Sequence, residues 1–271
     1  MGFLVIWLYA INDAVFQAAN ALVGWSWTLD ALIALPLTSP MVKAGPIGAC
    51  LFYVWWLKGS DTEVERRRSL ILITLIAVFL IAPITKIMST DATVPRPYLL
   101  AETVYVLDGG ELVASRQLAY RPPLAGDMEA RSSALRRGQI IPNDMASFPS
   151  DHAALFIALA AGIFLASRWA GLFALAWAII VTLGSRMAVG MHSPFDILAG
   201  GAFGVAILLA CRLAFGMGDR RLLRSVLAWV GRHEALAAAL LFISVLEVIS
   251  SMATSQRLVE LMRYFISGAM A

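Results

Sequence analysis

Long apolar stretches constrain the fold of this chain more than any other feature of its sequence. About 20 mostly apolar residues allow a helix to cross the hydrocarbon core of a bilayer. Of the 271 residues, 60% are hydrophobic and only 14% are charged, whereas a soluble domain has about 45–50% and about 25%. We therefore predict an all-α, polytopic membrane protein, a six-transmembrane-helix bundle in a single domain, 1–271. The predicted spans are 38–57, 69–89, 151–168, 169–189, 195–216 and 235–253.

The first apolar stretch, 3–24, is interrupted by polar side chains at near-helical spacing. Asn12, Asp13, Gln17 and Asn20 stand among its apolar residues. A helix with one polar and one apolar face lies in the membrane interface rather than across the bilayer. We expect an amphipathic interfacial helix here, and a further span is the alternative.

Basic residues in the connecting segments predict the orientation of the bundle. Short cytoplasmic loops carry an excess of Lys and Arg. If the six helices alternate in direction, the basic loops share one side, which this rule makes cytoplasmic. The external side then holds the polar segment 90–150, between the second and third helices, and the turn at 190–195. The basic residues are Lys58, Arg66, Arg67, Arg68, Arg168, Arg212, Arg220, Arg221, Arg224 and Arg232.

One short motif predicts local structure inside the external segment. Asp108-Gly109-Gly110 separates two short apolar runs, 104–107 and 112–114. Glycine and aspartate between such runs are typical of the turn of a β-hairpin. We therefore expect a small hairpin at this place.

Charge and cysteine content exclude several kinds of partner. The net charge is only +3, so no nucleic-acid partner is expected. Cys50 and Cys211 are far apart in apolar stretches, which is typical of buried free thiols. No His, Cys, Asp and Glu residues share the spacing of a zinc or calcium site. We therefore predict no metal and no cofactor.

Two histidines, two arginines and an aspartate fall on the external side of the predicted bundle. The planar guanidinium groups of Arg96 and Arg186 suit phosphate oxygens. Asp196 can accept the Nδ1 proton of His192 and leave Nε2 as an attacking atom. A protonated His152 can give its proton to a leaving oxygen. This set predicts phosphoryl chemistry with a histidine nucleophile.

The segments around these residues resemble signatures of the type 2 phosphatidic acid phosphatase superfamily. The members of this superfamily are membrane lipid phosphatases. Pro149-Ser150-Asp151-His152 is similar to the second signature. The third signature is similar to a longer pattern, in which five residues separate Ser185-Arg186 from His192 and three residues separate His192 from Asp196. The resemblance covers about 69–210. Phe148-Pro149-Ser150-Asp151-His152, with Asp where the family usually has Gly, resembles the motif of bacterial undecaprenyl-pyrophosphate phosphatases.

Two positions depart from the family pattern. The first signature of the family consists of a lysine and an Arg-Pro pair separated by six residues. In this chain Ser89 occupies the lysine position before Arg96-Pro97, and Lys86 lies three residues before Ser89. Three residues span about 4.5 Å of helix, a distance that a lysine stem can cover, so we expect Lys86 to be a phosphate ligand. Asp151 either caps the helix that follows it or places its carboxylate near the phosphate.

The resemblance implies a role for each matching residue. His192 would attack phosphorus and form a phosphohistidine, and Asp196 would orient its ring. His152 would protonate the leaving group and then activate the water that hydrolyses the intermediate. The implied phosphate ligands are Arg96, Arg186, Ser150, the Asp151 backbone amide and, by the argument above, Lys86.

The function implied is that of a metal-independent phosphatase in a bacterial inner membrane, with its site facing the periplasm or exterior. The predicted substrate is a lipid pyrophosphate or phosphate among the membrane lipids, with undecaprenyl pyrophosphate as first candidate. Phosphatidic acid, phosphatidylglycerol phosphate and lipid A require the same chemistry. One alternative is a phosphotransferase with a lipid or sugar acceptor. Another is a lipid-binding or transport protein, for which Glu247 in the last span would be a functional residue.

Overall fold

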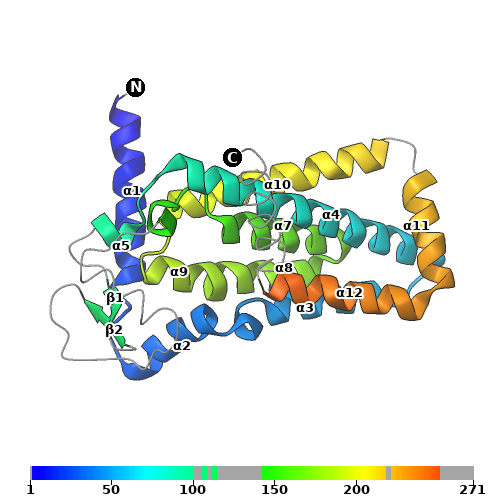
Figure 1. Ribbon diagram of the computed structural model, residues 1–271, viewed down its shortest axis with the longest axis horizontal. Coiled ribbons are helices and arrows are strands. Elements are labelled where there is room, and N and C mark those ends of the chain that lie inside the picture. Colours follow the sequence, from blue (N-terminus) through cyan, green and yellow to red (C-terminus); the bar gives the residue numbers. More distant parts are fainter. Residues whose placement is uncertain (1, 101–104, 109–110, 115–141, 218–220, 251–271) are drawn as a thin grey trace, which may run out of the picture. The chain divides into compact units, whose positions relative to one another are not determined.

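The computed structural model describes residues 2–100, 105–108, 111–114, 142–217 and 221–250, and these are predominantly helical (Figure 1). The helices are α1 (Gly2–Asn20), α2 (Trp27–Thr38), α3 (Pro40–Trp56), α4 (Asp61–Ala92), α5 (Pro97–Leu100), α7 (Asp151–Ala166), α8 (Arg168–Trp177), α9 (Gly184–Ala188), α10 (Pro194–Met217), α11 (Arg221–Arg232) and α12 (Glu234–Ile249). Two shorter helical turns are η1 (Pro142–Met145) and the π-helical η2 (Ala178–Leu183), and the strands are β1 (Tyr105–Asp108) and β2 (Glu111–Ala114). Each of the six predicted apolar stretches is helical over most of its length, which confirms the all-α class.

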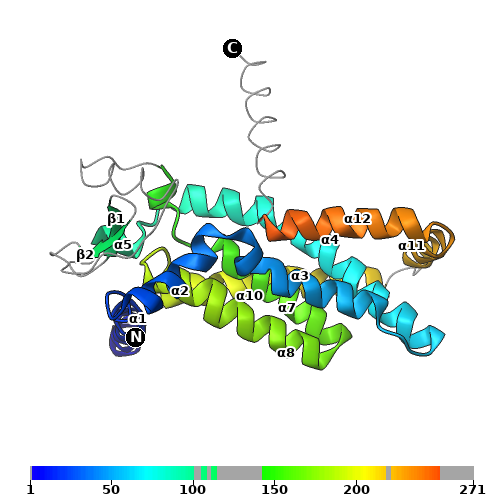
Figure 2. The same cartoon turned by 90° about the horizontal axis from the view of Figure 1, so that it is seen from below.

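The described helices include several that are long and apolar enough to cross a membrane. Three meet this criterion singly: Asp61–Ser89, Arg168–Ala188 and Pro194–Phe215. The pair α11 and α12 meets it jointly, although the two are bent by 114° relative to each other (Figure 2). The chain is therefore a multi-pass membrane protein. The number of six spans stays a prediction, because α3 and α7, which correspond to two of the predicted spans, have only 17 and 16 residues.

The described residues form two compact units, and each unit is assembled from three separate stretches of chain. Unit 1 consists of Met1–Lys43, Ile87–Ser150 and Ile179–Gly200. Unit 2 consists of Ala44–Lys86, Asp151–Ala178 and Gly201–Ala271. A single domain over 1–271 stays a prediction.

Unit 1 contains helices that pack around α9. Both α1 and α2 contact α9. A small apolar core joins the segment after α1, helix α2 and the end of α9; it consists of Val23, Ile33, Ala34, Ala188 and Val189. This packing places the segment after α9, residues 189–193, against the N-terminal helices of the same unit.

A β-hairpin lies in the part of unit 1 between α5 and η1 (Figure 1). Strands β1 and β2 pair antiparallel, with Tyr105 opposite Ala114 and Asp108 opposite Glu111. This confirms the hairpin that the Asp-Gly-Gly motif predicted. Most of the remaining external segment, 90–150, lies outside the described residues.

Unit 2 has the larger apolar core, built from α3, α4, α7, α8 and α12. Its largest fully buried side chains include Ile47, Leu51, Phe156, Leu159 and Ile163. A second cluster joins α4, α7 and α10 through Ala77, Ala154 and Leu208. Small residues allow these helices to approach closely, as is usual in membrane bundles.

Arginines at the start of α4 bind the carbonyl groups that end other helices of unit 2. Arg66 donates to the Leu165 and Ala166 oxygens at 3.1 and 3.4 Å. Arg67 donates to the Leu57 oxygen at 2.9 Å. The last carbonyls of a helix have no partner within the helix and accept such bonds. The 58–68 loop and the turn before Arg168 therefore lie at the same end of unit 2, as the alternation of helices predicted.

The close approach of α10 to α7 leads to a stability prediction. A Cβ atom added at Gly204 would overlap the Ala154 carbonyl oxygen, whereas one at Gly231 would meet nothing within 4 Å. We expect Gly204→Ala to lower the free energy of unfolding by about 1–3 kcal/mol, because the backbone has to shift. Thermal unfolding in detergent measures this.

The matched control is Gly231→Ala in α11, which should stabilise the protein by about 0.5–1 kcal/mol because alanine is the better helix former. Equal midpoints for Gly204→Ala and wild type would contradict the described packing of α7 on α10.

Candidate active site

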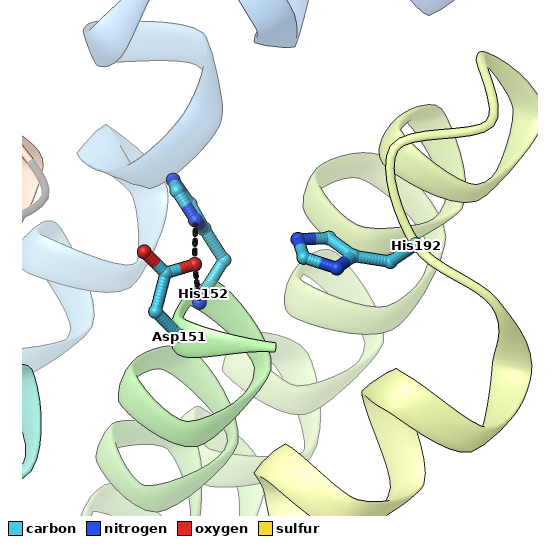
Figure 3. A group of neighbouring side chains, drawn as sticks. All are labelled: Asp151, His152 and His192. Atoms are coloured by element: carbon cyan, nitrogen blue, oxygen red, sulfur yellow. Dashed lines mark hydrogen bonds and ion pairs between the residues drawn. The ribbon is translucent and has the colours of Figure 1, made fainter. Parts of the chain in front are cut away.

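His192 lies in the segment that joins α9 to α10 in unit 1 (Figure 3). Its side chain is only 1% exposed. The ring Nδ1 is 3.0 Å from the Ser147 carbonyl oxygen. A carbonyl oxygen accepts hydrogen bonds but cannot donate one, so Nδ1 has to carry the proton. The neutral ring then has its lone pair on Nε2, where it can act as a nucleophile or a base.

Asp196 stabilises the start of α10, four residues after His192. Its Oδ2 accepts the Ser193 N–H at 2.6 Å, and the Ser193 hydroxyl accepts the Asp196 N–H at 3.3 Å. This reciprocal arrangement is a capping box, and Pro194 occupies the first helical position, where proline is favoured. The carboxylate thus fixes the residue that directly follows His192.

The same carboxylate oxygen also binds the segment that contacts the His192 ring. The Ser147 hydroxyl donates to Asp196 Oδ2 at 2.7 Å. This differs from the sequence prediction, in which Asp196 itself accepts the Nδ1 proton of His192. The capping box directs the carboxylate toward the α10 N-terminus and Ser147, so the Ser147 carbonyl takes the position beside Nδ1. Asp196 orients His192 indirectly, by holding residues 147 and 193.

Ser150 is tied to the same helix start by its backbone. Its N–H donates to the Asp196 carbonyl oxygen at 3.0 Å, and its side chain is fully buried. Further along, the Ser147 N–H donates to the Val94 oxygen at 3.0 Å. The 147–150 segment of the second signature is therefore held between the first and third signatures, all within unit 1.

Arg96 contacts the His192 segment directly. Its Nη1 donates to the Met191 oxygen at 3.0 Å and its Nε to the Asn143 oxygen at 2.8 Å. A third contact, from Nη2 to Asn143 Oδ1, is 3.5 Å long. A guanidinium group has five N–H donors, so at most two are left for a phosphate while these contacts persist.

Arg186 lies in α9 and is buried. Its Nη1 donates to the Thr182 oxygen at 3.3 Å, and its own carbonyl accepts the Met191 N–H at 2.8 Å. Arg96 and Arg186 thus both bind Met191, the residue before His192. The π-helical turn η2 directly precedes this part of the chain, and such turns are frequent at functional sites.

Asp151 and His152 begin α7 in unit 2 (Figure 3). Asp151 Oδ1 is 2.7 Å from the His152 backbone nitrogen and 2.7 Å from its ring Nδ1. An N-cap side chain accepts from the amide two or three residues ahead, whereas this contact is with the next residue, so the capping alternative for Asp151 stays a prediction. The second contact is new, and it fixes Nδ1 of His152 as a donor because an ionised carboxylate only accepts. The ring therefore presents Nε2 away from Asp151.

Lys86 is half-buried in α4 of unit 2. Ser89, at the family's lysine position, is buried one turn later in the same helix. The assignment of Lys86 as a phosphate ligand stays a prediction.

Three residues that hold the His192 segment in place had no predicted role. Ser193 could have been recognised, since Ser-Pro-x-Asp is a capping-box pattern with proline in the first turn. Ser147 acts through its backbone carbonyl, for which the sequence contains no signal. Asn12 binds the Phe195 N–H across 183 positions at 2.9 Å, a contact that no local pattern indicates.

The Ser147 contact predicts the tautomer of His192. The chain contains three histidines, so ¹⁵N-histidine NMR of the protein in detergent can resolve them, and His192→Ala identifies the His192 signals. We expect neutral His192 to carry its proton on Nδ1. Ser147→Ala removes the hydroxyl bond to Asp196 and should yield a mixture of both tautomers, because the carbonyl is then less firmly held.

A matched control is Thr74→Val, which removes a buried hydroxyl that binds the Leu70 oxygen within α4. It should leave the His192 signals unchanged. A wild-type His192 protonated on Nε2 would contradict the described geometry.

Comparison with known protein families agrees with this arrangement. A family model of the PAP2 superfamily matches residues 67–219. No curated protein and no solved structure matches the chain. The matched range contains His152, His192, Asp196 and both arginines. Since it covers more than half of the 271 residues, the chain belongs to the PAP2 superfamily of phosphatases.

Proposed function

We propose that the chain is a membrane lipid phosphatase that uses His192 as its nucleophile and acts on undecaprenyl pyrophosphate or a related lipid phosphate. Membership of the superfamily indicates a phosphatase for phosphate esters. The observation that carries the finer proposal is the buried His192 ring, whose Nδ1 donates to the Ser147 carbonyl oxygen. This contact leaves Nε2 as the atom able to attack phosphorus.

The first chemical step forms a bond between His192 Nε2 and phosphorus and breaks the bond from phosphorus to the leaving oxygen. His152 gives its Nε2 proton to that oxygen, so the leaving group departs as a lipid alcohol or a lipid phosphate. Asp151 supports this role, because its carboxylate, 2.7 Å from Nδ1 of His152, leaves the proton on Nε2 as the one to be donated.

The second step hydrolyses the phosphohistidine. His152, now neutral at Nε2, takes a proton from water while the water oxygen attacks phosphorus. The bond from phosphorus to His192 breaks, inorganic phosphate leaves, and both rings return to their starting protonation states. Negative charge on the phosphoryl oxygens would be stabilised by Arg96, Arg186, Lys86, Ser150 and the Asp151 backbone amide.

A lipid substrate is supported by the membrane location of the described helices. The acyl or prenyl tail can stay in the bilayer while the headgroup reaches the arginines. The choice of undecaprenyl pyrophosphate rests on the Phe-Pro-Ser-Asp-His motif at 148–152. The basic loop at the end of unit 2 supports a cytoplasmic position for that end. By alternation, the site would face the periplasm or exterior of a bacterial inner membrane.

Phosphate release from undecaprenyl pyrophosphate by the purified protein tests the proposal. His192→Ala should abolish release, because the attacking nitrogen is lost. EDTA is present because histidines and carboxylates are also metal ligands, and wild-type release should persist with it. His233→Ala is the matched control, since that exposed histidine precedes α12 and should have no effect.

Release that persists in His192→Ala would refute the nucleophile. Loss of release with EDTA would refute metal independence. If wild type fails on this substrate but releases phosphate from phosphatidic acid or lipid A, the substrate assignment is wrong while the chemistry stands. Labelled phosphate that appears on an added lipid or sugar acceptor would instead identify a phosphotransferase.

The two histidines also predict how activity depends on pH. His192 has to be neutral to attack and His152 has to be protonated to donate, so kcat/KM should fall on both sides of an optimum. His152→Ala should lower the rate and remove the alkaline decline, since that decline reports loss of the donated proton. A wild-type rate that changes in one direction only would contradict the two opposed roles.

A further inference from the structure

Helix α1 lies outside the range 67–219 that matches the family, yet it contacts the segment that holds the nucleophile. Its inner face is formed by residues four positions apart, which lie on one side of a helix. Asn12, Phe16 and Asn20 on this face are 9%, 6% and 3% exposed. Buried asparagine side chains need hydrogen-bond partners, and here the partners are backbone groups near His192.

The two asparagines bind either end of the His192 segment. Asn20 Nδ2 donates to the Ala188 oxygen at 2.6 Å, at the end of α9. The Phe195 N–H, in the first turn of α10, donates to Asn12 Oδ1 at 2.9 Å. That N–H is one of the amides a helix start leaves without an internal partner. Since Ala188 and Phe195 flank the nucleophile, α1 limits the movement of both attachment points.

Apolar contacts reinforce the same attachment. The Tyr9 and Phe195 rings meet edge to face with centroids 5.8 Å apart. Just beyond α1, Val23 packs with Ala188 and Val189. All of these residues belong to unit 1. The hydrogen bonds are therefore part of a packed interface rather than isolated surface contacts.

We infer that α1 is a positioning element for the nucleophile, in which Asn12 and Asn20 fix the two ends of the 188–195 segment. The inference rests on the proposed function, since it concerns the position of His192 Nε2 relative to the phosphorus atom of the substrate. Displacement of a reacting group by about 1 Å can cost about a hundredfold in rate. The substrate's contacts with Arg96 and Arg186 do not involve α1, so turnover should suffer more than binding.

The two asparagines use opposite hydrogen-bonding roles, which permits a sharp test. Asn12 accepts from Phe195 through its oxygen, a role that an aspartate can take, and its Nδ2 donates to Asp13 Oδ1 at 3.1 Å. Asn20 donates through nitrogen, and an aspartate cannot, because it would place a carboxylate against the Ala188 carbonyl. We expect Asn12→Leu and Asn20→Asp each to lower kcat by about tenfold or more, with KM changed by less than about twofold. Asn12→Asp combined with Asp13→Asn keeps one carboxylate and one amide at these two positions, and it should recover most of the activity that Asn12→Leu loses.

The control variant is Gln17→Ala, which removes an exposed polar side chain from the outer face of the same helix and should leave kcat unchanged. Equal losses in Asn20→Asp and in Asn12→Asp combined with Asp13→Asn would overturn the inference, because a general packing defect would not distinguish acceptor from donor. A loss expressed only in KM would overturn it as well.

Hydrogen exchange of the full-length protein separates this inference from the proposed function. Peptides covering 188–196 should exchange faster in Asn12→Leu and Asn20→Asp than in wild type and Gln17→Ala, whatever the substrate is. Wild-type exchange in both variants would refute the positioning role. If exchange rises as expected but wild type releases no phosphate from any lipid tested, the proposed function fails while the attachment of the segment to α1 stands.

Discussion

The Asp196 carboxylate is the interaction on which the rest of the site depends. One of its oxygens accepts both the Ser193 N–H and the Ser147 hydroxyl, at 2.6 and 2.7 Å. The Ser147 bond joins the third signature to the residues just before the second, 49 positions away in sequence. The Ser147 carbonyl then contacts Nδ1 of His192. Asp196, which we propose orients His192, thus also caps the helix that follows His192, so the start of α10 and the position of His192 depend on one carboxylate.

Burial explains why so many contacts converge on a short segment. Four backbone carbonyl oxygens around His192 accept hydrogen bonds. The Arg186 oxygen accepts from the Met191 N–H, and the Gly190 oxygen accepts from the Tyr98 N–H. The Ala188 oxygen accepts from the Asn20 side chain, and the Met191 oxygen accepts from the Arg96 side chain. Backbone groups removed from water are costly unless they are paired, and an irregular segment cannot pair them internally as a helix does. At membrane depth such backbone is tolerated only where protein surrounds it. The neighbouring helices of unit 1 supply the missing donors and at the same time restrict the movement of His192.

The parts of this protein that could be predicted from sequence are those with a local signal. The six apolar stretches became helices because length and composition decide that outcome in a membrane, and Asp-Gly-Gly marked the hairpin. The two signatures point to His152, His192, Asp196 and Arg186 by type and spacing, and the roles of these residues stay predictions. The partner of His192 Nδ1 could not be predicted, because a backbone carbonyl is common to every residue. Asn12 and Asn20 were interpreted as one face of an interfacial helix, although their inner position depends on residues more than 160 positions away.

The outer face of α1 has a consequence for how this protein is handled. Ile6, Trp7, Ile11 and Val15 are largely exposed on the described helix, and apolar side chains of this kind in a membrane protein face acyl chains. The surrounding lipid or detergent would therefore contact one side of α1, while the segment that contains His192 is hydrogen-bonded to the other side. Bilayer thickness and detergent chain length would then act as effectors of turnover. Rates measured in short-chain micelles and in native lipid would differ for the same folded enzyme, with no change in any residue that touches the substrate.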